Sequence, residues 1–231
     1  MKLKQYIKES NQRFNPELNL KGKVVIVSDP LPETIDVKSV LQKIDNLIPD
    51  HLFYGVEAIY IGNFPFFKER DINAMYQDGA LYITNHQDND EDMLDDIVHE
   101  IAHSNENLFG EVIYSNSKIE LEFNGKRNRL KSLLSLDFNT ENYNFSQTEY
   151  SKDLDEFFYK TIGYGLLSAY TEGLFSNPYA ATSLREYFAS GFEEYYLGDR
   201  QYLKKISPKL FKVLNNLHYM ELKDEYWDWR K

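Results

Sequence analysis

The pentapeptide His99-Glu100-Ile101-Ala102-His103 is the feature that most constrains the fold of this chain. Residues four apart lie on one face of an α-helix, so a helix here would bring both imidazoles within reach of one small metal ion. Apolar residues recur around the motif at helical spacing, namely Leu94, Ile97, Val98 and Ile101. Acids at 90–92 stand where the positive end of a helix dipole favours carboxylates. The pattern predicts a half-buried helix over 92–104, and the competing interpretation is an ordinary amphipathic helix that happens to carry two histidines.

Composition narrows the kind of site that these histidines can form. The chain has no cysteine, which excludes disulfides and thiolate zinc sites and leaves His and carboxylate side chains as the strong zinc ligands. Its 26 Lys and Arg against 37 Asp and Glu give a net charge of −11, which argues against nucleic acid and anionic membranes as partners. No stretch approaches the ~18 apolar residues of a membrane span, and the N-terminus lacks the apolar core of a signal peptide. We therefore expect a cytoplasmic protein by default, with export by another route left open.

The first half of the chain alternates short apolar runs with one amphipathic segment. After a polar N-terminal arm over 1–21, the pattern predicts strands at 23–28, 56–62 and 79–85, and a helix at 37–48 that begins at the N-cap Asp36. This order of elements indicates an α+β lobe over 1–105 with a small sheet. We interpret 79–85 as an edge strand beside the cleft, where an extended polypeptide substrate could dock, and a plain sheet edge is the alternative.

The second half has the periodicity of helices. The expected segments are 118–136, which is charged and amphipathic, 154–175, which is rich in aromatic residues, and 184–196, which ends before Gly198. Asn177-Pro178 separates the last two. Because no linker or repeat lies between the halves, we expect a single domain over 1–231, with a helical lobe over 106–231.

Two histidines are too few for a catalytic zinc site, which usually has three protein ligands and one open position for water. A metzincin would need glycine and histidine at the positions of Glu106 and Phe109, so that pattern fails. Glu120 and Glu122 stand at about the spacing of thermolysin-like sites, but the alternating residues around them do not show the helical context that such a site requires.

Glu186 is a better candidate for the third ligand. On the helix expected over 184–196 it points away from the aromatic stripe, toward Ala189 and Ser190, whose small side chains would permit close approach to the metal helix. The alternative is a capping box, in which Ser183 and Glu186 only satisfy backbone groups at the start of the helix.

The residues around Glu186 resemble a known family. The segment 179–189, followed by Phe192 and by Ser207-Pro208-Lys209-Leu210-Phe211, is similar to the end of the catalytic domain of anthrax toxin lethal factor and its relatives. In that family a Glu in a Glu-aromatic-Phe-Ala motif completes the His-Glu-x-x-His site, and a Tyr seven positions earlier assists catalysis. The resemblance covers 92–104 and 179–216, but not the middle of the chain.

The resemblance implies a zincin-like metallopeptidase fold, with a small mixed sheet, an active-site helix and a mainly helical C-terminal lobe. It assigns Zn²⁺ to His99, His103 and Glu186, the general base to Glu100, and the phenol that assists at the developing oxyanion to Tyr179. The alternative for Tyr179, one of 18 tyrosines, is simple packing beside Pro178. The expected function is a zinc-dependent metalloendopeptidase, and the negative net charge favours basic peptides as its substrates.

Two departures from the family pattern support a different function. The interval from His103 to Glu186 is 186 − 103 = 83 residues, which indicates an inserted helical region over 106–178. Ser190 replaces an acidic residue that is usual four positions after the ligand, which puts the support of the metal ligands in doubt. The alternative function is therefore a catalytically inactive binding protein with this fold, or a phage-associated structural protein. The oligomeric state stays open.

Overall fold

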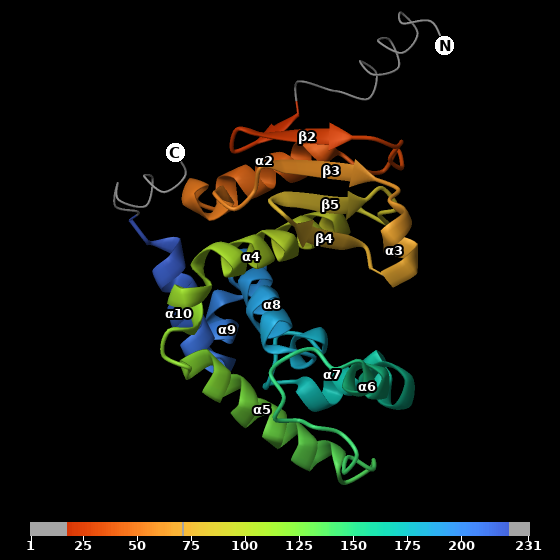
Figure 1. Ribbon diagram of the computed structural model, residues 1–231, viewed down its shortest axis with the longest axis vertical. Coiled ribbons are helices and arrows are strands. Elements are labelled where there is room, and N and C mark those ends of the chain that lie inside the picture. The colour runs from red at the N-terminus through yellow and green to blue at the C-terminus, as the bar shows by residue number, and fades with distance from the viewer. Residues whose placement is uncertain (1–17, 71, 222–231) are drawn as a thin grey trace, which may run out of the picture. The chain divides into compact units, whose positions relative to one another are not determined.

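A computed structural model describes residues 18–70 and 72–221, so most of the expected N-terminal arm lies outside the described residues (Figure 1). The chain divides between Leu108 and Phe109 into two compact units. We call the described residues up to 108 the sheet unit and residues 109–221 the helical unit. None of the helices in the described residues is both long enough and apolar enough to cross a membrane.

The sheet unit contains a five-stranded mixed sheet, which confirms the α+β class. Its strands are β1 (Asn19–Leu20), β2 (Lys23–Val27), β3 (Ala58–Gly62), β4 (Ala74–Gln77) and β5 (Ala80–Thr84). They lie in the order β1-β2-β3-β5-β4, as Figure 1 shows for the four longer strands. The three central strands are parallel, and β1 and β4 pair antiparallel at the two edges. Alternate residues of the central strands are fully buried and form the core beneath the sheet, including Val25, Ile59, Ile61, Leu81 and Ile83.

The predicted edge strand at 79–85 is not at an edge. β5 lies between β3 and β4, so its backbone groups are hydrogen-bonded on both sides. The cause is the turn Asp78-Gly79, in which both residues have positive φ, +49° and +84°. A two-residue turn of this kind folds a hairpin tightly, so β4 pairs back onto β5 and takes the edge. Peptide docking along 79–85 is therefore excluded.

Two helices flank the strands early in the chain. α2 (Val37–Leu47) begins where predicted, because the side chain of Asp36 accepts a hydrogen bond from Ser39 N at 3.1 Å. Its apolar face is buried along the predicted positions. A 3₁₀ turn, η1 (Asp50–Phe53), and a short helix, α3 (Pro65–Arg70), occupy the connections on either side of β3.

The predicted metal helix is α4 (Asp90–Tyr114), which runs well past the expected end at 104. Asn89 caps it, because its Oδ1 accepts from Asp92 N at 2.9 Å. The stripe residues Ile97, Val98 and Ile101 are fully buried, which fixes how the helix is rotated about its axis. The backbone departs from helical geometry at Phe109, with φ −115° and ψ 16°, and the boundary between the two units falls at this kink.

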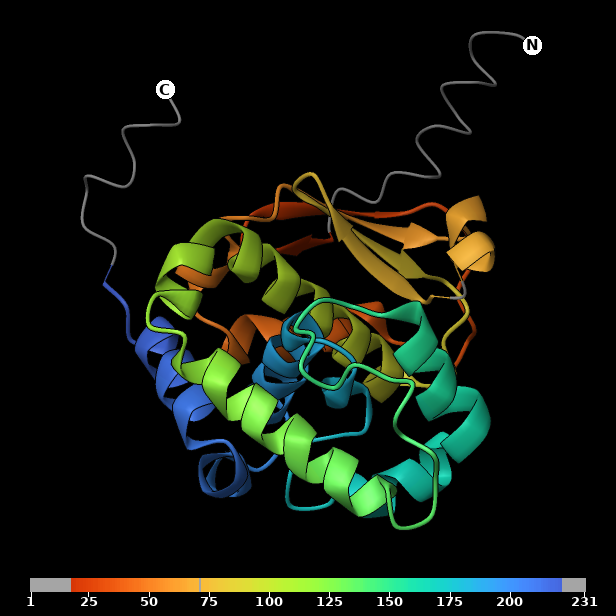
Figure 2. The same cartoon turned by 60° about the horizontal axis from the view of Figure 1, so that its bottom comes forward.

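The helical unit is built around α5 (Lys118–Leu134) and α8 (Leu184–Tyr196). The remaining elements are α6 (Lys152–Glu156), η2 (Phe157–Ile162), α7 (Tyr164–Thr171), η3 (Tyr179–Ala181), α9 (Arg200–Ile206) and α10 (Pro208–His218). In Figure 2 α5 runs the length of this unit, with α10 near its start and α6 and α7 near its end. α8 packs so closely on α10 that a Cβ at Gly191 would lie 2.3 Å from Leu210 Cδ2. This contact explains why glycine interrupts the aromatic face of α8.

The segment 154–175 is helical, as its periodicity predicts, but it is not one continuous helix. The segment forms α6, the π-helical turn η2 and α7, and the chain turns at Gly163, where φ is +78°. An α-helix cannot continue through a residue with positive φ, although the apolar periodicity runs on across it.

Glu122 lies on a helix after all, but its carboxylate has a structural role. It accepts hydrogen bonds from Lys209 N and Leu210 N, at 2.9 and 3.1 Å, and from the Tyr187 hydroxyl at 2.9 Å. The carboxylate therefore caps the N-terminus of α10. These contacts argue against the thermolysin-like ligand assignment.

Arg127 connects α5 to the start of α8. It is fully buried, and its guanidinium donates to the carbonyl oxygens of Thr182 and Asn144, both at 3.3 Å. The same group lies over the rings of Phe123 and Phe145. Thr182 immediately precedes the cap of α8, so this buried cation holds the chain where that helix begins.

Candidate metal centre

His99 and His103 lie on one face of α4, as the four-residue spacing predicts. Their ring centroids are 4.9 Å apart with the rings nearly perpendicular. His99 is half-buried and His103 is buried. Because the apolar stripe of α4 packs into the core of the sheet unit, the orientation of both imidazoles is set by a rigid helix instead of a loop.

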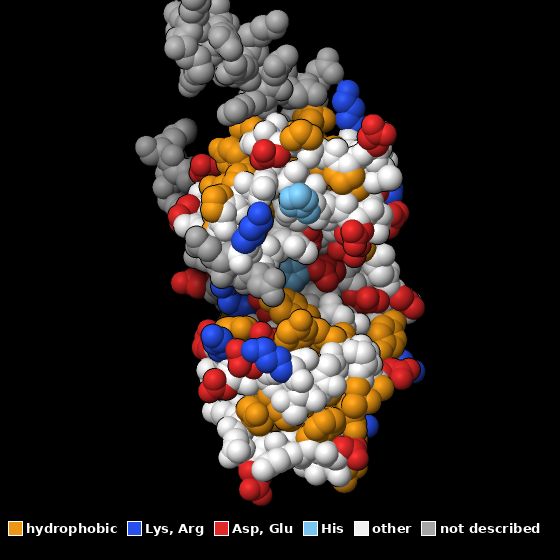
Figure 3. Space-filling view, turned by 90° about the vertical axis from the view of Figure 1, so that its right-hand side faces the viewer, with side chains coloured by type: hydrophobic (Ala, Val, Ile, Leu, Met, Phe, Trp, Pro, Cys, Tyr) orange, Lys and Arg blue, Asp and Glu red, His pale blue; other side chains and the backbone are white. Residues whose placement is uncertain are grey.

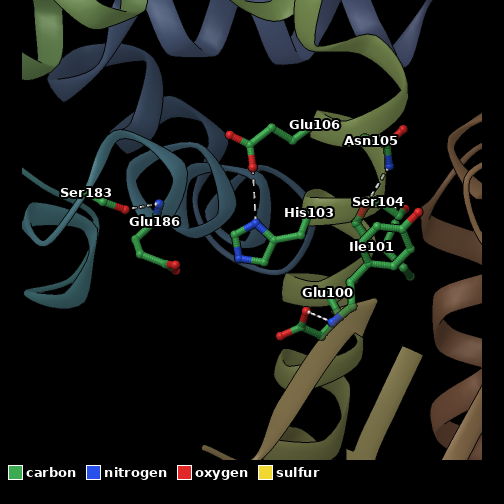
Figure 4. Close-up of polar contacts among 9 residues, drawn as sticks. Glu100, Ile101, His103, Ser104, Asn105, Glu106, Ser183 and Glu186 are labelled. Atoms are coloured by element: carbon green, nitrogen blue, oxygen red, sulfur yellow. Dashed lines mark hydrogen bonds and ion pairs between the residues drawn. The ribbon is translucent and has the colours of Figure 1, made fainter. Parts of the chain in front are cut away.

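Glu106 orients His103. The Nδ1 atom of His103 lies 3.3 Å from Glu106 Oε2, and both side chains are buried (Figure 4). A carboxylate accepts hydrogen bonds, so it holds the proton on Nδ1 and leaves Nε2 as the nitrogen for a metal ion. In the sequence, Glu106 stands where a metzincin would have glycine, and it was not predicted as a site residue. Its position three residues after His103 on the same helix was the signal that could have identified it.

Glu100 is buried beside the histidines and is tied to the sheet. Its Oε2 accepts a hydrogen bond of 2.5 Å from the backbone N–H of Tyr76 in β4. Tyr76 is itself anchored, because its hydroxyl donates to Gly55 O at 3.1 Å. The edge strand thus fixes the carboxylate of Glu100, the predicted general base. No pattern in 74–77 signalled this contact.

Glu186 lies in the first turn of α8, in the helical unit. Ser183 is the N-cap of α8, because its Oγ accepts from Glu186 N at 3.2 Å. The cap thus uses the backbone of Glu186, while its carboxylate extends away from the Ser183 hydroxyl in Figure 4. Ala189 and Ser190 are fully buried, and Ser190 Oγ has no hydrogen-bond partner among the described residues.

Tyr179 begins η3 and belongs to a group of tyrosines near carboxylates. It is 40% exposed, and burial of the rest of the side chain, followed by the charges of Glu186 and Asp155, raises the pKa of its phenol. Tyr179 therefore keeps its proton at neutral pH and can donate a hydrogen bond.

Tyr150 and Tyr164 were not identified from the sequence. Their hydroxyls donate to the two carboxylate oxygens of Asp155, at 2.8 and 3.5 Å. Burial, together with Asp155, raises the pKa of each to about 12. Both tyrosines come from the region 106–178, which the family resemblance does not cover.

His99 and His103 belong to the sheet unit and Glu186 to the helical unit, so the group of three ligands stays a prediction. No protein-family model matches this chain, and comparisons with curated proteins and with solved structures found no match either.

Proposed function

We propose that this chain is a zinc-dependent metalloendopeptidase with a zincin-like fold. The observation that carries the proposal is the helix α4, which presents His99 and His103 on one face with Glu106 behind His103 and Glu100 held beside them. Two imidazoles and the carboxylate of Glu186 are the donor types of a catalytic zinc site with one open position for water. The mixed sheet beside this helix agrees with the architecture that the resemblance implies.

Each side chain has a defined task in this proposal. His99, His103 and Glu186 would hold the zinc ion, which would supply a water of pKa about 7 and polarise the scissile carbonyl. Glu100 would take a proton from the attacking water and deliver it to the leaving amine. Tyr179, whose raised pKa keeps the phenol protonated, donates a hydrogen bond to the carbonyl oxygen on which negative charge develops.

Metal content tests the ligand set. Wild type, Glu186→Ala and Glu172→Ala are purified identically, supplied with zinc, and measured by mass spectrometry. Glu172 is an exposed carboxylate of the same unit and serves as the matched control. We expect about one zinc per chain in wild type and control, and binding weakened at least about a hundredfold in Glu186→Ala with an unchanged circular dichroism spectrum. Wild-type protein that takes up no zinc would end the peptidase proposal.

Glu106→Gln is expected to weaken zinc binding about 10- to 100-fold, because the amide holds the Nδ1 proton of His103 less strongly than the carboxylate. Competition against a chromophoric chelator measures the affinity. Glu111→Gln, an exposed change on α4, should leave it unaltered. Equal zinc affinities of Glu106→Gln and wild type would show that this carboxylate does not support the ligand.

The proposed substrates are basic polypeptides, and the support is the net charge of −11. Length-matched peptides that differ only in having Lys or Glu around the same central bond provide the comparison. Cleavage of both at the same rate would remove this part of the proposal without affecting the peptidase assignment.

A catalytically inactive protein with this fold, serving in binding or as a phage-associated structural component, is the second candidate. One observation favours it: Ser190, at the position where the related family has an acidic residue, is buried without a hydrogen-bond partner among the described residues. This candidate predicts zinc binding without turnover of any peptide in a library screen.

A further inference from the structure

A cavity of about 520 Å³ lies within the helical unit, between α5, α9 and the turn that follows α7. Three cationic side chains line it: Lys126 and Arg129 from α5, and Lys205 from α9. The chain as a whole carries a net charge of −11, and acidic side chains are spread over the face in Figure 3. A second hollow of the same unit is also lined by three lysines, Lys118, Lys209 and Lys212. All three are exposed, whereas Lys126 in the cavity beside α9 is buried.

Lys126 is held in this wall without a carboxylate partner. The side chain is only 9% exposed, its Nζ donates to Ser207 Oγ, and the described residues place no acidic oxygen within salt-bridge distance of it. Its ammonium lies 4.8 Å from the centre of the Tyr187 ring, which supplies a weaker attraction. Burial lowers the pKa of Lys126 to about 8, against the opposing effect of Glu122.

Glu122 is the one carboxylate in the lining, and it does not balance the three cations. Its oxygens accept hydrogen bonds from two backbone N–H groups of α10 and from the Tyr187 hydroxyl. Arg129 and Lys205 are exposed and form no salt bridge within the described residues. The cavity therefore presents uncompensated positive charge from two different helices.

We propose that this cavity binds a small oxyanion, either a phosphate ester or a polycarboxylate. An Arg fork and two ammonium groups suit the several oxygens of such a ligand. Tyr202, which also lines the cavity, accepts a hydrogen bond from Gly173 N at 3.2 Å and so retains its own proton for donation to the ligand. An anion next to Lys126 would also place an opposite charge within salt-bridge distance of this buried cation, closer than the charge of Glu122 that already acts on it. This site is independent of the proposed zinc site.

Calorimetric titration of the full chain with inorganic phosphate and with succinate tests the proposal, in buffers whose ionic strength is matched with NaCl. The variant Arg129→Ala/Lys205→Ala removes two lining cations. Lys131→Ala/Lys204→Ala removes the same charge from α5 and α9, at positions outside the lining. We expect saturable binding by wild type and the control, weakened about tenfold or more in the lining variant. Preference for phosphate identifies a phosphate ester as the ligand type, and preference for succinate identifies a polycarboxylate.

A cavity-filling variant separates binding from loss of charge. Gly125 lines the cavity in α5, and a Cβ there would meet no atom within 4 Å. Gly125→Leu should therefore fold and reduce anion binding at least about tenfold by occupying the space. Gly165→Leu in α7 is the control, because that position is equally open and lies outside the lining. Absence of saturable binding by wild type, or equal losses in the lining and control variants, would overturn the proposal.

Discussion

Glu100→Gln is expected to lower peptide hydrolysis about 10³-fold while zinc remains bound. Glutamine cannot take a proton from the attacking water or return it to the leaving amine. The exchange is nearly isosteric, and the amide oxygen can still accept the hydrogen bond from Tyr76 N. The geometry around His99 and His103 should therefore persist, so the loss reports proton transfer and not a displaced metal site.

Single-turnover cleavage of a peptide found in a library screen measures this effect, with zinc content determined on the same samples. Glu91→Gln removes an exposed carboxylate from the first turn of α4 and serves as the control. Retained hydrolysis in Glu100→Gln would show that another group acts as the base. Loss of zinc together with activity would place Glu100 in support of the metal site instead.

Arg127→Ala is expected to destabilise the helical unit by about 4 kcal/mol. The change leaves a cavity under Phe123 and Phe145 and removes the donors to Thr182 O and Asn144 O. The melting temperature should fall by roughly 10 °C. Because Thr182 precedes the cap of α8, the position of Glu186 should become less defined, and zinc affinity should fall with stability.

Arg129→Ala is the matched control, because it removes the same side chain two residues further along α5 at an exposed position. Differential scanning calorimetry of both variants gives the comparison, and the control should stay within about 0.5 kcal/mol of wild type. Equal melting temperatures for the two variants would mean that the buried guanidinium contributes no net stability, as some buried ions do when their desolvation offsets their contacts.

Local signals account for the parts of the fold that could be predicted. The Asp36 cap and the apolar faces of α2 and α4 depend on residues a few positions apart, so periodicity located both helices. β4 was missed because Ala74-Met75-Tyr76-Gln77 lacks the β-branched residues of a typical strand. The segment is extended because it pairs with β5. The break at Gly163 was missed because apolar spacing continues across a residue with positive φ.

In the candidate site, too, local patterns predicted some residues, and contacts between distant residues determine the others. His99 and His103 share one helix, so their spacing was sufficient to pair them. Glu106 shares that helix too, but a polar residue on a helix surface has many ordinary roles, and only its contact with His103 distinguishes it. The hydrogen bonds of Tyr150 and Tyr164 to Asp155 connect residues from different elements, which no local pattern predicts. Its place on the helix expected over 184–196 favoured Glu186 as a ligand, and the family resemblance strengthened that assignment.

The turn Asp78-Gly79 has a consequence for how this protein can change during evolution. Most surface turns tolerate insertions, because their length affects nothing beyond the loop itself. Here the turn sets the register in which β4 meets β5, and Tyr76, two residues before it, holds Glu100. One added residue would exchange the two faces of β4 and carry the N–H of Tyr76 away from the carboxylate. The length of the turn between β4 and β5 should therefore be conserved among descendants of this chain as strongly as His99 and His103.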